Sequence, residues 1–135
     1  MTTAQIKGAL EVALGTITPA ISTSYENVAF TPPDAQTAFQ IATTAFATPD
    51  NAEYGASSMA LGAFYVRLQY PLNVGTANAL ARAELVKAKF KRGASFVAGG
   101  STVVSSKTPE INIIGVELDR LCVLVKIPFH SYQGA

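Results

Sequence analysis

One thiol and one imidazole are the side chains of this sequence that most directly suggest nucleophilic chemistry. Cys122 is the single cysteine and His130 the single histidine. Both fall within Arg120–Tyr132 (RLCVLVKIPFHSY), where alternating apolar residues predict one long strand. A strand rises about 3.3 Å per residue, so the two side chains should lie roughly 26 Å apart. A Cys/His pair acts only within hydrogen-bond reach, so we expect Cys122 to be a small, half-buried strand residue and His130 an edge or end residue.

Metal, cofactor and phosphate sites have no better support. One histidine, one cysteine and nine scattered acids give no spacing typical of a zinc site. The glycine-rich stretch Gly93–Ser101 (GASFVAGGS) lacks the lysine that follows the glycines of a phosphate loop. A hairpin turn at Gly99-Gly100 explains these glycines better. We therefore expect no catalytic residues, no metal ligands and no cofactor.

Five cations gather in one part of the sequence: Arg82, Lys87, Lys89, Lys91 and Arg92. Cations in the last turn of a helix interact favourably with the helix dipole. We therefore favour the interpretation that these five cations belong to a solvated helix face. The alternative is a patch that docks an acidic neighbour, or DNA that passes nearby.

The clearest long loop of the sequence is Thr48–Ser58 (TPDNAEYGASS), which contains several turn-forming residues. Its candidate contact residues are Asp50, Asn51, Glu53 and Tyr54. An aromatic side chain at the tip of a loop can anchor an interface, or it can fold back and pack against its own loop. Both interpretations remain open for Tyr54.

Composition indicates one domain, residues 1–135, with some of its surface covered by other subunits. Charged residues make up 14% of the chain, against about 25% in ordinary domains, which favours an oligomer. The net charge of +1 argues against sequence-independent DNA binding. No apolar stretch approaches the roughly 18 residues that span a bilayer, and MTTAQIKGAL does not read as a secretory signal.

Two helices are expected among the elements that position the candidate residues. The first carries an apolar stripe at helical spacing and ends before Pro19; the stripe is Ile6, Leu10, Ala13, Leu14 and Ile17. The second spans Ala77–Lys91, with Thr76 able to cap it and Gly93 as its stop. The apolar face that we expect for it consists of Ala77, Leu80, Ala81, Leu85 and Ala88.

The remaining periodic segments predict strands. We expect them at Tyr25–Phe30, Phe39–Phe46, Met59–Tyr70, Ser95–Val97, Thr102–Ser105, Ile111–Val116 and Arg120–Tyr132. The two longest should each place one apolar face in the core. These faces are Gly62, Phe64, Val66, Leu68 and Tyr70 in one strand, and Leu121, Val123, Val125, Ile127 and Phe129 in the other. The fold class that follows is α+β: a mainly antiparallel sheet with two helices packed on one face.

Four segments of the sequence resemble the tail terminator (tail completion) proteins of tailed phages. They are IKGALEVAL in the first helix, YENVAFTPP at Tyr25–Pro33, YVRLQYPLNVGTANALARAELVKAKF at Tyr65–Phe90, and VLVKIPFHSY at Val123–Tyr132. The order of a strand ending in Tyr-Pro, a short turn and a helix rich in Ala, Arg and Glu is characteristic of this family.

The resemblance implies a structural protein of the virion rather than an enzyme. Members of the family form a ring, with six copies, at the head-proximal end of the tail tube, in the neck of the particle. The ring ends tube polymerisation and offers a surface to the head-tail connector proteins, and DNA can pass through its lumen. The implied partners are further copies of the chain, the tail tube protein and the connector proteins, and the chain would be made in the host cytoplasm. By its place in the order of elements, Thr48–Ser58 would be the loop that docks on the tube.

Two alternatives stay open at this point. One is a different neck component, such as a head-tail adaptor or stopper. The other is a small α+β domain that binds a ligand or acts as an enzyme. A tail tube gene or tape-measure gene beside this one would favour a virion role over the second alternative.

Overall fold

Two long antiparallel strands form the centre of the sheet in the computed structural model of the chain. They are β3 (Ser58–Pro71) and β7 (Arg120–Gln133), and they pair without interruption from Ser58↔Gln133 to Pro71↔Arg120. Alternate residues of each strand are apolar, which lets one face of the pair be buried while backbone groups bond across the strands. The structure describes residues 3–18, 21–26, 28, 30–31, 37–47, 58–72, 75–98, 101–117 and 120–133.

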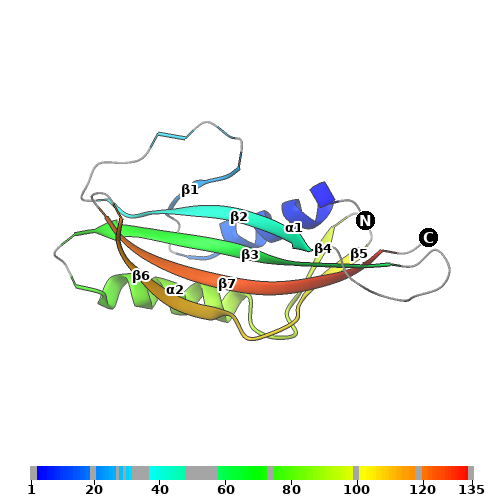
Figure 1. Cartoon of the computed structure of the whole chain (residues 1–135). Coiled ribbons are helices and arrows are strands. Elements are labelled where there is room, and N and C mark those ends of the chain that lie inside the picture. The colour runs from blue at the N-terminus through cyan, green and yellow to red at the C-terminus, as the bar shows by residue number, and fades with distance from the viewer. Residues whose placement is uncertain are drawn as a thin grey trace.

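Shorter strands extend this pair on both sides (Figure 1). On one side, β2 (Phe39–Ala47) pairs antiparallel with β3, and β1 (Ser22–Ser24) adds in parallel to the start of β2. On the other side, the first part of β7 pairs with β6 (Glu110–Glu117), and a later part pairs with β5 (Ser101–Ser105). The outer neighbour of β5 is β4 (Ser95–Ala98). In the described part of the chain, the sheet therefore has the order β1-β2-β3-β7-β5-β4, with β6 beside β7.

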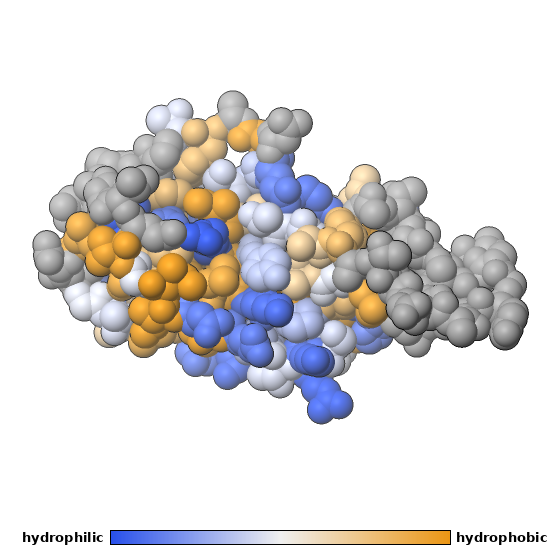
Figure 2. Space-filling view, viewed as in Figure 1, coloured by the Kyte–Doolittle hydropathy of each residue, from blue (hydrophilic) through white to orange (hydrophobic). Residues whose placement is uncertain are grey.

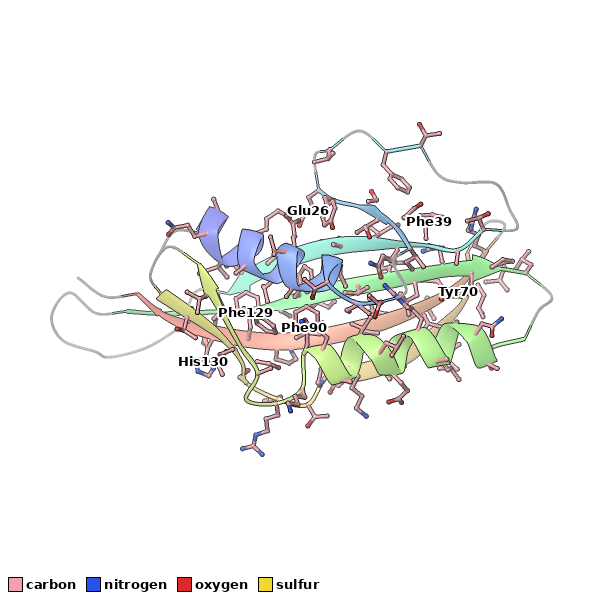
Figure 3. The ribbon with its side chains drawn as sticks, turned by 180° about the vertical axis from the view of Figure 1, so that it is seen from behind. Glu26, Phe39, Tyr70, Phe90, Phe129 and His130 are labelled. Carbon is pink, nitrogen blue, oxygen red and sulfur yellow. The ribbon has the colours of Figure 1, made fainter. Side chains whose placement is uncertain are left out.

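Two helices, α1 (Thr3–Gly15) and α2 (Ala77–Lys89), cover the same face of the sheet, as Figure 3 shows from behind. The core lies between them and the inward side chains of the two central strands. On β3 these are Phe64, Val66 and Leu68, and on β7 they are Val123, Val125, Ile127 and Phe129. The α+β architecture and both predicted strand faces are thus confirmed, as is the stripe of α1, whose large residues Ile6, Leu10 and Leu14 are buried.

The expectation of a strand at Tyr25–Phe30 was wrong. The strand lies just before it, at Ser22–Ser24, and the Val28 amide bonds to the Tyr25 carbonyl in a turn. The side chains explain this change of direction. Tyr25 packs against the core, and the Glu26 carboxylate accepts a hydrogen bond from the backbone N–H of Thr44 on β2. These contacts turn the backbone away from further ladder pairing with β2.

The expected apolar face of α2 was also wrong. The helix buries Ala79, Ala83 and Val86, and Phe90 follows them as a fully buried residue directly after the helix. Ala77, Ala81, Leu85 and Ala88 are exposed, and Leu80 is half-buried. Two alanine-rich stripes compete in this sequence, and the large side chains decide between them. Phe90 packs against Phe64 and Phe96, with ring centroids 5.6 and 5.1 Å apart, and this fixes the rotation of the helix.

The helix is also two residues shorter than expected. It begins directly after Thr76, whose side chain forms no capping hydrogen bond. Beyond it, Gly93 has a φ of 86°, a conformation that glycine adopts without strain. The N–H of Gly93 donates to the carbonyl of Ser105, which joins the end of the helical segment to β5.

Candidate functional site

Cys122 and His130 stay apart in the fold, as the strand spacing predicts. Both belong to β7 and share its face away from the helices, eight residues apart. The expectation that Cys122 is half-buried was wrong, because the residue is fully buried. Its sulfur lies 3.5 Å from the amide nitrogen of Gln69 on the neighbouring strand. His130 is half-buried and stands in register with Leu61 on β3 and Val104 on β5. The structure therefore does not bring this thiol and this imidazole together.

Within the described residues, no three side chains among histidine, cysteine, aspartate and glutamate are placed to hold a metal ion. The two described helices are too short to cross a membrane.

The five cations that are grouped in the sequence do not all lie on the surface. Lys89, Lys91 and Arg92 are exposed at the end of α2, with Lys87 half-buried beside them. Arg82 is instead buried, next to Tyr70 at the end of β3. Burial lowers the pKa of the Arg82 guanidinium, while the nearby Tyr70 opposes this shift. Burial likewise raises the pKa of Tyr70, against the effect of Arg82. The surface patch thus comprises four cations, and Arg82 belongs to the packing between α2 and the sheet.

The loop residues Asp50, Asn51, Glu53 and Tyr54 lie outside the described residues. The structure shows the two strands that the loop connects. They are antiparallel neighbours, and Ala47 on β2 stands in register with Leu61 on β3. β3 continues beyond this point to Ser58, and there its pairing partner within the described residues is β7. The loop segment therefore joins adjacent strands at one end of the sheet.

Two salt bridges and a hydrogen bond connect α1 to the outer edge of β2. The ammonium of Lys7 lies 2.8 Å from a carboxylate oxygen of Glu11 and 2.9 Å from one of Glu26. The same Glu26 oxygen accepts the N–H of Thr44 at 2.6 Å. This backbone bond, followed by the bond from Lys7, lowers the pKa of Glu26. Burial opposes the charged form of Lys7, but its bonds to both glutamates outweigh burial and raise its pKa.

This contact also blocks part of an exposed sheet edge. β1 covers only the first three residues of β2, so the outer edge of β2 beyond Ile41 has no strand partner in the described chain. Unpaired edge N–H groups attract strands from other chains. The Glu26 carboxylate occupies the Thr44 N–H on this edge.

A first apolar surface surrounds the outer side of α1, and we name it the α1 shoulder. Its most exposed members are Val97 at 73%, Val12 at 70% and Val28 at 59%. A hollow of about 450 Å³ separates α1 from β4, lined among others by Val12, Phe96, Val97 and Lys89. A second hollow, of about 370 Å³, lies between α1 and the Tyr25–Val28 turn. Gly8 lines both hollows, and the absence of a side chain there keeps the surface of the helix open.

A second apolar surface lies along β6, and we name it the β6 edge. It consists of Val116, Ile113 and Ile114, which are 65%, 53% and 47% exposed. A bulge between Ile113 and Gly115 interrupts the ladder with β7. In the described chain, β6 pairs with β7 only, so its outer edge is open. Such an exposed apolar edge is typical of a contact with another chain.

The sheet face away from the helices is more mixed. Figure 2 shows polar side chains in a central band with apolar regions to either side. A hollow of about 520 Å³ on this face is lined by residues that include Leu61, Tyr65, Lys126 and Pro128. This surface has less apolar character than the α1 shoulder or the β6 edge.

Sequence reasoning missed the α1 shoulder and recognised β6 only as a strand. The sequence did contain a signal for the apolar surface of β6. Ile113 and Ile114 are consecutive, so they cannot both point into one core. For the shoulder, Val12 falls outside the buried stripe of α1, but a single exposed valine is ordinary in a surface helix. Only the fold brings it beside β4 and the Tyr25–Val28 turn.

Comparisons with known proteins agree with this architecture. A family model described as phage tail terminator protein matches residues 5–129. A solved structure that is 21% identical in sequence superposes with a TM-score of 0.72, covering 100% of this chain and 98% of the other. At this identity the likeness shows a shared fold. A search of curated proteins found no match.

Proposed function

The chain belongs to the phage tail terminator family, a family of structural tail proteins, and we propose that it ends the growing tail tube as a ring at the head-proximal end. The observation that carries this proposal is the family match, which extends over residues 5–129 and so includes both helices and almost the whole sheet. The ring would stop polymerisation of the tube and offer the head-tail connector proteins a surface for joining. Its place would be the neck of the virion, after synthesis in the host cytoplasm.

Two features of the fold support a ring. The β6 edge and the α1 shoulder are apolar, exposed and formed by different elements. A ring requires two different surfaces on each subunit, because each copy contacts one neighbour with each. The sparse charge of the chain agrees with surfaces that other copies cover. Six copies are proposed from the example of the family, and DNA would pass through the lumen.

The contact with the tail tube is proposed for the loop Thr48–Ser58. The loop joins neighbouring ends of β2 and β3, so it would lie at one end of the sheet. In this proposal Tyr54 is the anchor, Asp50 and Glu53 provide charge complementarity to the tube protein, and Asn51 lies between them. The next candidate for a contact with a partner is the patch of the exposed Lys89, Lys91 and Arg92 with the half-buried Lys87.

The experiment that tests this function is electron microscopy of particles made without the protein. We expect tails that are longer than normal or that have not joined to heads, and a plasmid copy of the gene should restore normal particles. Tails of normal length, joined to heads, would contradict the proposed function.

A further inference from the structure

We propose that the β6 edge of each subunit packs against the α1 shoulder of the next copy. This inference rests on the proposed ring and names the two surfaces that close it. Val97, Val12 and Val28 supply the apolar contacts on one side, and Ile113, Ile114 and Val116 supply them on the other. Burying such side chains is the main favourable contribution to most protein association.

Charge complementarity identifies the occupant of each surface as another copy. Lys89 lines the hollow of the α1 shoulder, and the exposed Lys91 and Arg92 follow it in the chain. β6 begins with the exposed Glu110, which stands in register with Lys126 on β7, and β6 itself contains no cation. An apolar strand that begins with an acidic residue therefore complements an apolar hollow that Lys89 lines. Opposite charges of this kind fix the orientation of two partners.

The charges at both surfaces are also available for a partner. Within the described chain the salt bridges are those of Lys7 with Glu11 and with Glu26. Lys89 therefore forms none, and neither does Glu110, although it stands in register with Lys126 on β7. Glu110 is exposed at the start of β6. A contact between Glu110 of one copy and Lys89 of the next would join the start of β6 to the hollow that Val12 and Val97 also line.

The sheet edges distinguish this arrangement from direct pairing of two edges. The edge of β2 already has its Thr44 N–H bonded to Glu26, whereas the apolar edge of β6 is open in the described chain. Two β6 edges paired with each other would give a closed dimer with twofold symmetry, which cannot extend into a ring. A strand edge against the different surface of α1 gives the head-to-tail contact that a ring needs.

Cysteine cross-linking tests the contact directly, because the one native thiol, Cys122, is fully buried. Particles would be assembled with the Val97→Cys, Ile113→Cys and doubly substituted proteins, then treated with a short bismaleimide linker. We expect the double variant to give a ladder of linked subunits up to the full ring, and either single variant to give monomers. Dimers from Ile113→Cys alone would show pairing of two β6 edges and overturn the proposal. A double variant that stays monomeric in particles with normal tails would overturn it as well.

Charge reversal provides an independent test. Glu110→Lys or Lys89→Glu should each weaken association roughly fivefold per interface, the range of an exposed ion pair, and lower the fraction of tails of normal length. The double reversal should restore that fraction, because each interface again joins opposite charges. Glu84→Lys reverses another exposed glutamate, which lies on α2 outside both surfaces, and serves as the matched control.

The outcomes separate this inference from the proposed function. If tails without the protein are overlong but the double reversal gives no recovery, the proposed role in ending the tail stands and this interface is wrong. The interface is also wrong if the single reversals behave like Glu84→Lys. If tails without the protein are normal, the proposed function itself fails.

Discussion

Gly62 shows how closely single residues constrain this sheet. A Cβ at this position would lie 2.3 Å from the Ala45 carbonyl oxygen and 2.8 Å from the Phe129 ring. Backbone cannot move aside as a flexible side chain can, so we predict that Gly62→Ala destabilises the fold by about 1–3 kcal/mol, the range of an overpacked core. The measurement is the free energy of unfolding in denaturant.

Gly8→Ala is the matched control for this substitution. A Cβ at Gly8 meets no atom within 4 Å, and alanine favours a helix over glycine by about 0.5–1 kcal/mol. It should therefore stabilise the protein slightly. Equal effects of the two variants would contradict the close approach at Gly62.

Glu26 makes one part of the stability depend on pH. Its pKa in the folded protein lies below the usual 4.5, because it accepts the Thr44 N–H and then the Lys7 ammonium. The stability that it contributes is therefore fully present above about pH 4.5 and is lost as the pH falls through its lowered pKa. Glu26 is partly exposed, and solvent screening limits this contribution to no more than about 1 kcal/mol.

The Glu26→Gln variant measures this contribution, since glutamine keeps an oxygen acceptor but does not titrate. We expect the wild type to be more stable than the variant at pH 7, and the difference to shrink between pH 4.5 and pH 3. Unfolding free energies of both proteins across this range provide the measurement. A difference that is constant with pH would show that the charge of Glu26 is unimportant.

Cys122 and His130 should be dispensable for infection. Cys122→Ser places a hydroxyl in a buried position, where Gln69 is close enough to bond with it, so a stability loss of about 1–2 kcal/mol is expected. His130→Gln affects a half-buried side chain and should cost less. Phage titre with each variant is the readout. Loss of viable phage with the protein still folded would argue for a chemical role of either residue.

At the scale of elements, long alternating strands were the most predictable part of the fold. β3 and β7 could be read from the sequence because their alternation continues for many residues and matches one buried face. The three residues of β1 could not, because the contacts of Tyr25 and Glu26 with distant elements set where that strand ends. The face of α2 was missed since alanines on both sides gave nearly equal patterns, and Phe90 lies beyond the helix.

The candidate sites were less predictable than the strands. Arg82 was grouped with the lysines as a possible surface patch. Helical spacing alone does not show that this cation lies next to Tyr70. The α1 shoulder depends on three segments that are far apart in sequence. A local pattern cannot report such a surface, and it emerges only when the sheet brings β4 and the Tyr25–Val28 turn to the two sides of α1.

The role of the loop between β2 and β3 stays a prediction. Replacing Asn51–Ala56 with a short Gly-Ser linker should leave the thermal transition almost unchanged, since the core of the fold lies in the helices and the sheet. Tails should become overlong or fail to join heads, because the docking residues Glu53 and Tyr54 are lost. Tail lengths by electron microscopy and thermal unfolding together provide the test. Normal termination with this variant would move the docking surface elsewhere, with the Lys87–Arg92 cluster next.

At the scale of the whole molecule, the chain has a well-packed core but leaves two apolar surfaces uncovered. Its core is complete between the helices and the central strands, so the subunit does not need a partner to bury its largest side chains. The β6 edge and the α1 shoulder remain exposed, and neither covers the other within one copy. A closed ring would cover both surfaces in every copy, whereas an open chain of subunits would leave one of each exposed at its ends.

A reconstruction of the virion at the junction of head and tail tests this account most directly. We predict a closed ring of this chain, with six copies, between the last layer of the tail tube and the connector proteins. In that ring, the β6 edge of each copy should face the α1 shoulder of the next. A single copy of the chain at this position, or a symmetry that does not match the tube, would contradict the account.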